Sequence, residues 1–463
     1  MSTKLEIPGA VETADLRDVA TDVVARAMKA GATAADTIVR EGTEFSTVVR
    51  LGQVETLKES GSRGLGLRVF LGRRTASTYS SDFTREGIER LVHGALELAR
   101  VTSEDPFAGL PEPQELGALS GDLQLFYEDV YSLPPEERIN FARRAERAAL
   151  DCDRRLTNSD GGSFDASTGG RVLANSLGFV GESRSSFCSV MAAPIAQAEN
   201  ASSSMQRDYW FSAARTLKKL DSPESVGREA ARRTLRRLGA RKIASTKVPI
   251  VFDPMMAGSL LSSIFDAVNG DAIYRQSSFL EGMLGEKIAD SNVTIVDDGT
   301  IVGGFGTTPF DGEGVPTRRT VVVEKGVLKS YLLNTYTARK LGLKTTGSAG
   351  RGLAGNPGIT TRNAYLEAGT KTAQQIIAGV KNGFYVTEFL GFGVNLVTGD
   401  YSRGASGLWI ENGELAYPVE EVTVAGNLRE MLNNIAEIGS DLVFRGPTAA
   451  PTLRIEGMTV GGE

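Results

Sequence analysis

The sequence has very few of the side chains that bind transition metals. Its 463 residues include one histidine, His93, and two cysteines, Cys152 and Cys188, with no CxxC pair. A disulfide framework and a zinc ribbon are therefore excluded, and any Ser/His/Asp or Cys/His site would depend on His93. So few cysteines are typical of a reducing compartment, and we expect a cytoplasmic protein.

Long apolar runs and an excess of positive charge are also absent. No stretch of about 18 apolar residues occurs, so we expect no membrane span. Residues 1–18, MSTKLEIPGAVETADLRD, lack a basic region followed by an apolar one, so we expect no export signal. The formal net charge is -6, which disfavours general binding to nucleic acid.

The composition, with 41% hydrophobic and 23% charged residues, is that of an ordinary globular protein. The length predicts about two to four domains. Five of the 16 prolines lie between residues 103 and 135, in an acidic stretch that is typical of a linker. We predict an α+β fold with an N-terminal α+β domain (1–105), a middle α+β region (119–243) and a mainly β C-terminal domain (244–463).

Local patterns fill in these regions. Apolar residues at helical spacing predict helices over residues 13–30, 84–101, 136–151 and 223–238, with His93 on an exposed face. Five short β-rich runs between residues 36 and 79, separated by glycines, predict an antiparallel meander. Hairpins are predicted at Asp298-Gly299, Lys325-Gly326 and Asn412-Gly413, and a half-buried strand at the C-terminus.

Two conspicuous motifs favour ordinary structure over a binding site. Residues 350–355 fit GxGxxG, but no strand precedes them and no helix follows, so a flexible loop is favoured over a dinucleotide site. The surrounding segment, Gly347–Gly358, is long enough to serve as a lid. Arginines and a lysine crowd the helix around Arg228–Lys242, where a solvated charged face is favoured over a phosphate-binding surface.

Other catalytic arrangements are incomplete. Residues 404–408, GASGL, lack the last glycine of a nucleophile elbow, which argues against a serine hydrolase. The one possible set of soft metal ligands is His93, Cys152 and Cys188, which lie far apart in the sequence. The carboxylates of Asp253, Asp266 and Asp271 could hold a hard cation, although such residues more often lie at turns or on the surface.

Several blocks of the C-terminal half resemble the TldD/PmbA family, and the block TGDYSRGASGLWIENGE at residues 398–414 resembles its PmbA (TldE) branch. The resemblance implies a two-subunit cytoplasmic protease that cleaves unfolded peptides. In this arrangement a TldD-like chain carries a zinc-binding HExxxH motif and a PmbA-like chain pairs with it. An older description of the family is modulator of DNA gyrase.

The resemblance also shows where the metal motif would fall. In TldD-like chains it follows a G-x-L-L stretch, here Gly258–Leu261, which places the His, Glu and His positions at Ser262, Ser263 and Ala267. None of these side chains can hold zinc or act as its base. The family's third ligand, a cysteine, would fall within residues 439–446, GSDLVFRG, which hold no thiol. We therefore expect no catalytic residue, metal or cofactor in this chain, and zinc in a TldD-like partner.

The same segment has the pattern of a regular helix. Histidines five residues apart lie about 140° apart around a helix, so the catalytic motif requires a distorted one. Here Leu260, Leu261, Ile264, Phe265 and Val268 recur at helical spacing, which predicts a core-facing helix free of metal constraints.

A peptide-binding role rests on the turn-rich block Gly399–Gly404. Arg403 could contact a peptide carboxylate or carbonyl and Tyr401 could offer a stacking surface, although a structural role for Asp400 and Arg403 in holding a β-turn is favoured. Two alternatives stay open: a metallopeptidase that acts alone through an unrecognised site, and a regulatory protein that acts on a topoisomerase or DNA. Self-association also stays open.

Overall fold

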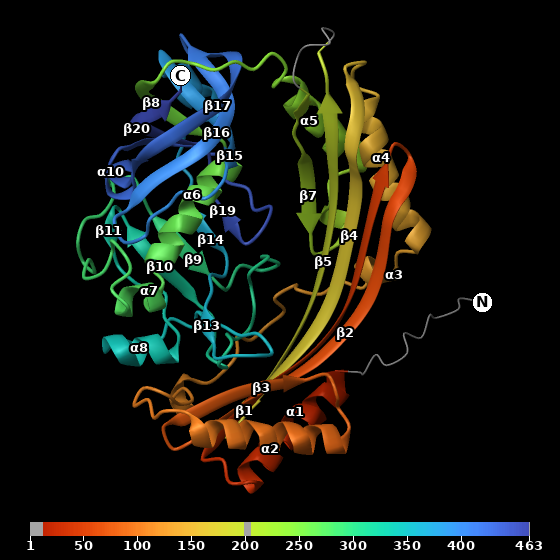
Figure 1. The fold of residues 1–463 in the computed structure, drawn as a ribbon, viewed down its shortest axis with the longest axis vertical. Coiled ribbons are helices and arrows are strands. Elements are labelled where there is room, and N and C mark those ends of the chain that lie inside the picture. The colour runs from red at the N-terminus through yellow and green to blue at the C-terminus, as the bar shows by residue number, and fades with distance from the viewer. Residues whose placement is uncertain (1–12, 199–204, 463) are drawn as a thin grey trace.

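The computed structural model describes residues 13–198 and 205–462. Two lobes face each other, an N-terminal lobe (residues 13–238) and a C-terminal lobe (residues 246–462) (Figure 1). Helices and extensive sheets occur in both, which confirms the predicted α+β class. The predicted absence of an export signal concerns a segment that lies, up to residue 12, outside the described residues.

One twisted seven-stranded sheet runs through the N-terminal lobe, in the order β3-β2-β1-β4-β5-β6, with β7 also paired to β5. Its strands are β1 (Ala34–Arg50), β2 (Gln53–Leu71), β3 (Arg74–Ser80), β4 (Leu156–Asn175), β5 (Val180–Ala196), β6 (Gln206–Arg207) and β7 (Trp210–Ala214). The predicted antiparallel meander is confirmed in β1, β2 and β3, but its division into five short strands was wrong, because β1 and β2 continue through Gly42 and Gly61 as two long paired strands.

Helices cover this sheet in two groups, each with its own core. The helices of the lobe are α1 (Thr13–Lys29), α2 (Arg85–Val101), α3 (Asp129–Ser132), α4 (Pro135–Leu150) and α5 (Pro223–Leu235), with short 3-10 helices η1 (Pro113–Glu115) and η2 (Leu217–Lys219). α1 and α2 pack on one end of the sheet, whereas α4 and α5 pack on the other (Figure 1). The helices predicted from periodicity are confirmed, and His93 is exposed on α2.

The predicted linker crosses between the lobes. Ala108 and Leu110 pack on Phe70 of the N-terminal lobe. Farther along, the backbone N–H groups of Gly117 and Leu119 donate to carbonyls of the C-terminal lobe at 2.9 and 2.8 Å. Because β1 pairs with β4, one sheet spans the predicted regions 1–105 and 119–243. The division between these regions stays a prediction.

A closed barrel forms one half of the C-terminal lobe. The ring β17-β16-β15-β8-β20 closes through pairing of β20 with β17, and β18 lies beside β20. Its strands are β8 (Thr246–Phe252), β15 (Asn382–Leu390), β16 (Asp400–Glu411), β17 (Glu414–Asn427), β18 (Ile435–Ile438) and β20 (Leu453–Gly461). Asn412 and Gly413 join β16 to β17 with φ of 50° and 83°, the left-handed turn that the sequence predicts.

A second sheet has the order β11-β10-β9-β14-β19. Its strands are β9 (Ile295–Asp298), β10 (Arg319–Glu324), β11 (Val327–Leu328), β14 (Ala364–Leu366) and β19 (Thr448–Ala449), and β12 (Ala349–Gly350) pairs separately with β13 (Gly358–Ile359). The Lys325-Gly326 hairpin is confirmed between β10 and β11. The Asp298-Gly299 hairpin was wrong, because β9 pairs with β10 only after a connection of residues 299–318.

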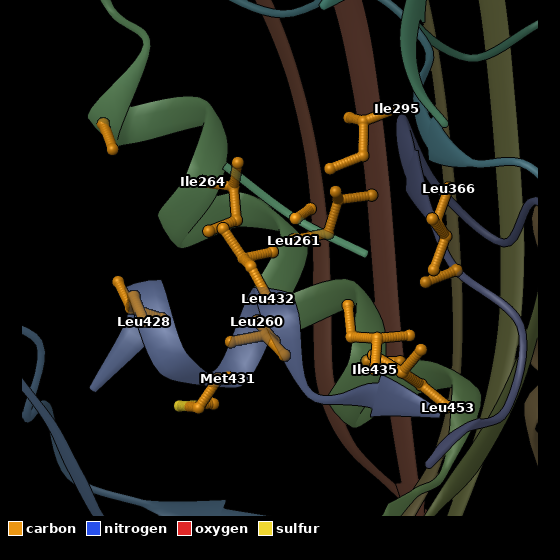
Figure 2. Packing of buried hydrophobic residues seen from close by; sticks show 14 of the residues in the cluster. Leu260, Leu261, Ile264, Ile295, Leu366, Leu428, Met431, Leu432, Ile435 and Leu453 are labelled. Carbon is orange, nitrogen blue, oxygen red and sulfur yellow. The ribbon is translucent and has the colours of Figure 1, made fainter. Parts of the chain in front are cut away.

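A single large core fills the space between the barrel and the second sheet. The helices of this lobe are α6 (Pro254–Ala267), α7 (Gly270–Tyr274), α8 (Thr335–Leu341), α9 (Ala373–Ala378) and α10 (Leu428–Asn433). Figure 2 shows leucines of α6 packed against α10, β14 and β18. In the described parts of the chain, no helix combines the length and the apolar character needed to cross a membrane.

Candidate functional site

Helix α6 carries the positions of the metal motif. Asp253 precedes it and accepts a hydrogen bond from the N–H of Met255 at 3.1 Å, and Pro254 occupies the first turn, so the sequence starts a helix there. Leu260, Leu261 and Ile264 point into the core (Figure 2). The predicted core-facing helix is therefore confirmed.

The three motif positions offer no metal ligand. Ser262 is exposed and its Oγ donates to the carbonyl of Gly258 within the helix at 3.1 Å. Ser263 is half-buried, and Ala267 is fully buried in the core. Zinc sites use imidazole, thiolate or carboxylate ligands, so these residues do not fit the ion that the family resemblance implies. Asp266 lies on the same helix, where burial raises the pKa of its carboxyl.

The other donors do not converge. Across residues 13–198 and 205–462, no group of three or more His, Cys, Asp and Glu side chains could hold a metal ion. His93 is exposed on α2, Cys152 is exposed after α4, and Cys188 is buried in β5, where its Sγ lies 3.5 Å from the carbonyl of Ala214. The structure thus brings together neither the soft set nor the carboxylates of Asp253, Asp266 and Asp271.

The window predicted for the third ligand serves another purpose. Arg445, within residues 439–446, extends to the N-terminal lobe and lies 4.4 Å from the ring of Trp210. Its guanidinium also reaches the carbonyl of Phe211 at 3.5 Å. This segment therefore connects the lobes.

Arg403 lies beside α6. It donates to Ser259 Oγ at 2.8 Å and to the carbonyl of Gly391 at 3.1 Å, and its guanidinium stacks 4.5 Å from the ring of Phe389. Ser259 lies about one helical turn before Ser262 and Ser263. The structure thus places one predicted peptide-binding residue next to the motif positions, although the two are about 140 residues apart.

The other two predicted peptide-binding residues have structural surroundings. Asp400 accepts hydrogen bonds from Thr398 at 2.6 Å and Asn427 at 3.1 Å, which lower the pKa of its carboxyl and hold the turn before β16. Tyr401 is 1% exposed, and burial raises its pKa. The expected stacking surface at Tyr401 was wrong, because alternation along β16 directs this ring into the core.

An apolar loop beside Arg403 was not predicted from the sequence. In the segment that joins β15 to β16, the side chain of Phe392 is fully exposed, and those of Leu390 and Val397 are more than half exposed. Hydrogen bonds from Ser402 to Gly393 at 2.7 Å and from Asn395 to Asp400 at 2.8 Å hold the segment in place. These side chains are thus presented on an ordered backbone.

The basic helix is a solvated face only in part: Arg228 and Arg232 are exposed, but other arginines face the C-terminal lobe. Arg233 of α5 is buried, with Asp208 at 3.4 Å and Asp253 at 3.5 Å, and Arg237 pairs with Glu388 of the barrel at 2.6 Å. The sequence shows which residues of this helix are charged, but it does not show that the C-terminal lobe covers some of them. This helix end therefore contributes to a contact between the lobes.

The glycine-rich segment is not a free lid. Residues 349–359 form the β12–β13 hairpin, and Arg351 within it is buried against Asp36 of β1 at 2.6 Å. Leu353 lies on Gly64 and Gly66 of β2, where an added Cβ would come within 2.2 Å of its atoms. The small residues of β2 thus allow this hairpin to dock on the N-terminal lobe.

Comparison with known proteins agrees with this architecture. Three parts of the chain match domains of the PmbA/TldA metallopeptidase: domain 1 at residues 35–99, the central domain at residues 128–238 and the C-terminal domain at residues 245–462. Metalloprotease PmbA of Escherichia coli O157:H7 is 39% identical, over 93% of this chain and 92% of that protein. The Haemophilus influenzae PmbA homolog is 34% identical, over 97% and 96%.

Crystal structures give the same result. A Bacteroides thetaiotaomicron protein described as a candidate modulator of DNA gyrase matches with a TM-score of 0.90 and 30% identity, over 98% of this chain and 100% of that one. TldE of Thermococcus kodakarensis has the same fold, with a TM-score of 0.85 and 21% identity, over 96% and 100%. This chain is therefore a member of the PmbA/TldA metallopeptidase family.

Proposed function

We propose that this chain is a metal-free, non-catalytic subunit of a heteromeric metallopeptidase that degrades or processes unfolded peptides. The observation that carries the proposal is which residues occupy the motif positions of α6. The motif positions there hold Ser262, Ser263 and the buried Ala267, in a regular helix. A hydrolytic zinc ion, which polarises a carbonyl and supplies a nucleophilic water, would belong to a TldD-like partner.

The surroundings of α6 support a role in holding peptide. Arg403 combines a charge with donors that can meet a carboxylate or a peptide carbonyl, and it is anchored by Ser259 and Gly391. The exposed Phe392 lies one residue from Gly391 and offers apolar contact. A basic group next to an exposed aromatic ring suits unfolded peptides, which expose both backbone and apolar side chains.

The first experiment compares the chain alone with the chain plus its partner. Purified alone, it should contain no stoichiometric zinc by elemental analysis and should cleave no unfolded peptide. Addition of a TldD-like chain should give proteolysis that a chelator abolishes. Metal-dependent cleavage by the lone chain would contradict the proposal and favour a metallopeptidase that acts alone.

A substitution tests the peptide-binding part of the proposal. Arg403→Ala should raise KM of the assembled peptidase about tenfold and leave kcat within about twofold, because one charge-assisted contact is lost on binding. Asp400→Asn, on the same strand but engaged in its own turn, is the matched control and should change neither value. An unchanged KM in Arg403→Ala would remove this residue from the peptide site.

A further inference from the structure

Three arginines converge where the N-terminal sheet meets the C-terminal lobe. Arg40 of β1 and Arg171 of β4 stand directly opposite each other in the antiparallel ladder, and both are half-buried. Arg362, which precedes β14, is 8% exposed and close enough that its charge helps to lower the pKa of Arg171. The three come from both lobes, and Arg40 and Arg362 donate to carbonyls of the docked β12–β13 hairpin.

None of these guanidinium groups has an acidic partner. Arg40 donates to the carbonyl of Arg351, Arg171 to the carbonyl of Phe310 at 2.8 Å, and Arg362 to the carbonyl of Ala349 at 2.7 Å. Arg171 also donates to the hydroxyl of Thr308. Among the described residues, none of the three forms an ion pair within 4.0 Å, and the buried Nε atoms of Arg40 and Arg362 have no acceptor.

The nearby carboxylates are engaged elsewhere. Asp311 accepts hydrogen bonds from the N–H groups of Glu313 at 2.8 Å, Val315 at 3.0 Å and Ala349 at 3.0 Å. Asp36 pairs with Arg68 at 2.5 Å and with Arg351 at 2.6 Å. The charges of Asp311 and Asp297 also act on Arg362 and partly offset the effect of burial on its pKa. Among the described residues neither carboxylate forms an ion pair within 4.0 Å with the three arginines, so an excess of positive charge remains that no direct ion pair relieves.

This excess is unfavourable for the protein alone. Like charges directly opposite each other in a sheet destabilise it. Burial, together with the charges of Arg362 and Arg40, lowers the pKa of Arg171 to about 9. Contacts with backbone carbonyls do not require three charged groups, since neutral donors could make them at lower cost. Groups that oppose stability in this way are characteristic of binding sites.

We propose that Arg40, Arg171 and Arg362 bind an oxyanion, either a carboxylate or a phosphate group. Guanidinium groups bind both with paired, charge-assisted hydrogen bonds, and a bound anion would supply the missing acceptors and the missing negative charge. A peptide C-terminus and free inorganic phosphate are two sources of this chemistry. The site is separate from α6 and does not depend on the proposed subunit role.

The experiment uses the full chain and three probes: inorganic phosphate and two hexapeptides of one sequence, with a free or an amidated C-terminus. Calorimetric titration should show binding of phosphate, of the free-acid peptide, or of both, and a bound probe should raise Tm. The amidated peptide should bind at least about tenfold more weakly than the free acid. Preference for the free acid over phosphate would identify a peptide as the source, and the reverse would identify a free anion.

Substitutions separate an anion site from a purely structural contact. Arg171→Gln should weaken anion binding at least about tenfold and should leave Tm without anion unchanged or higher, because repulsion is removed. Arg143→Gln, an exposed residue of α4, is the matched control and should change neither. Arg40→Gln serves as the second variant if Arg171→Gln does not fold. No binding of any probe by the unmodified chain, or equal binding by the variants, would overturn the proposal.

Discussion

Two of the contacts between the lobes, here called the lower and the upper contact, use the same kinds of charge in inverse arrangements. At the lower contact one carboxylate, Asp36, lies between two guanidinium groups, those of Arg68 and Arg351, at 2.5 and 2.6 Å. At the upper contact one guanidinium, Arg233, lies between the carboxylates of Asp208 and Asp253, at 3.4 and 3.5 Å. All six side chains are buried.

The difference lies in how firmly each group is held. At the lower contact Asp36 accepts hydrogen bonds from Arg68, and the charged atoms lie 2.5 and 2.6 Å apart, against 3.4 and 3.5 Å at the upper contact. Buried atoms without a hydrogen-bond partner occur at both contacts, Arg351 Nε and Nη1 at the lower one and Arg233 Nε and Asp208 Oδ2 at the upper one. A buried ion pair stabilises a fold only when its geometry is good, and removal of one partner is costly in proportion to the charge left behind. The lower contact should therefore fix the lobes more strongly than the upper one.

The largest expected effect is that of Asp36→Asn. This change leaves the buried guanidinium group of Arg351 without its carboxylate and that of Arg68 with only Glu313 at 3.8 Å, so we expect the free energy of unfolding to fall by about 3–5 kcal/mol. Equilibrium unfolding in urea measures it. Asp22→Asn, which breaks the exposed pair with Arg26, is the control and should leave the urea midpoint unchanged. A small effect of Asp36→Asn would show that the lower contact is not the stronger one.

Another buried carboxylate, that of Asp297, can be compared with Asp36 through the pH dependence of stability. Asp297 accepts a hydrogen bond from the backbone N–H of Arg362 at 2.6 Å but, among the described residues, has no ion pair, and burial raises its pKa to about 6. At Asp36 burial acts in the same direction, but the charges of Arg351 and Arg68 outweigh it and lower the pKa.

The raised pKa of Asp297 determines whether stability rises or falls with pH. Because the pKa of Asp297 is higher in the folded state, the folded chain binds the extra proton, and its stability rises as pH falls from about 6 to about 4. Relative to Asp297→Asn, the unmodified chain should gain about 2–3 kcal/mol between pH 7 and pH 4.5. Urea unfolding at several pH values checks this. A constant difference between the two chains over that range would contradict it.

Much of the fold could be predicted from local sequence because it depends on local signals. Helices α1, α2, α4 and α5 follow from apolar periodicity and from caps such as Thr84 and Ser222. The number of strands between residues 34 and 80 could not be predicted from local sequence, because β1 and β2 continue through Gly42 and Gly61. Glycine in a strand usually weakens it. Pairing with β4, about 125 residues away, stabilises these strands, and local sequence carries no sign of it.

In the candidate site, too, some features could be predicted from local sequence and others depend on tertiary packing. The family motif located Ser262, Ser263 and Ala267, and periodicity predicted which side of α6 enters the core. The contact of Arg403 with Ser259 depends on how the barrel packs on α6, so sequence could not show it. The burial of Tyr401 and the docking of Arg351 are also tertiary effects, and for this reason the expected stacking surface was wrong and local sequence did not show the docked hairpin.

Disruption of the upper contact should lower the free energy of unfolding less than disruption of the lower contact. Arg233→Met keeps the length and apolar contact of the side chain with Trp210 but removes the charge between Asp208 and Asp253. Asp253 keeps its hydrogen bonds from Met255 and Tyr385, and Asp208 keeps one from Tyr209, so we expect a loss of about 1–2 kcal/mol. Urea unfolding alongside Asp36→Asn tests the order of the two contacts. A larger loss than for Asp36→Asn would reverse it.

The smallest effect should come from α6 itself, which begins at Asp253 of the upper contact. Ser262→Ala with Ser263→Ala removes two hydroxyls, one of which bonds only within the helix, so stability should change by no more than about 0.5 kcal/mol. In the assembled peptidase kcat should stay within about twofold, since the proposal assigns these serines no chemistry. Leu261→Ala, on the opposite side of α6, is the control and should cost about 2–5 kcal/mol through the cavity it creates. A strong fall in kcat for the serine variant, with stability kept, would show that the outer face of α6 takes part in catalysis.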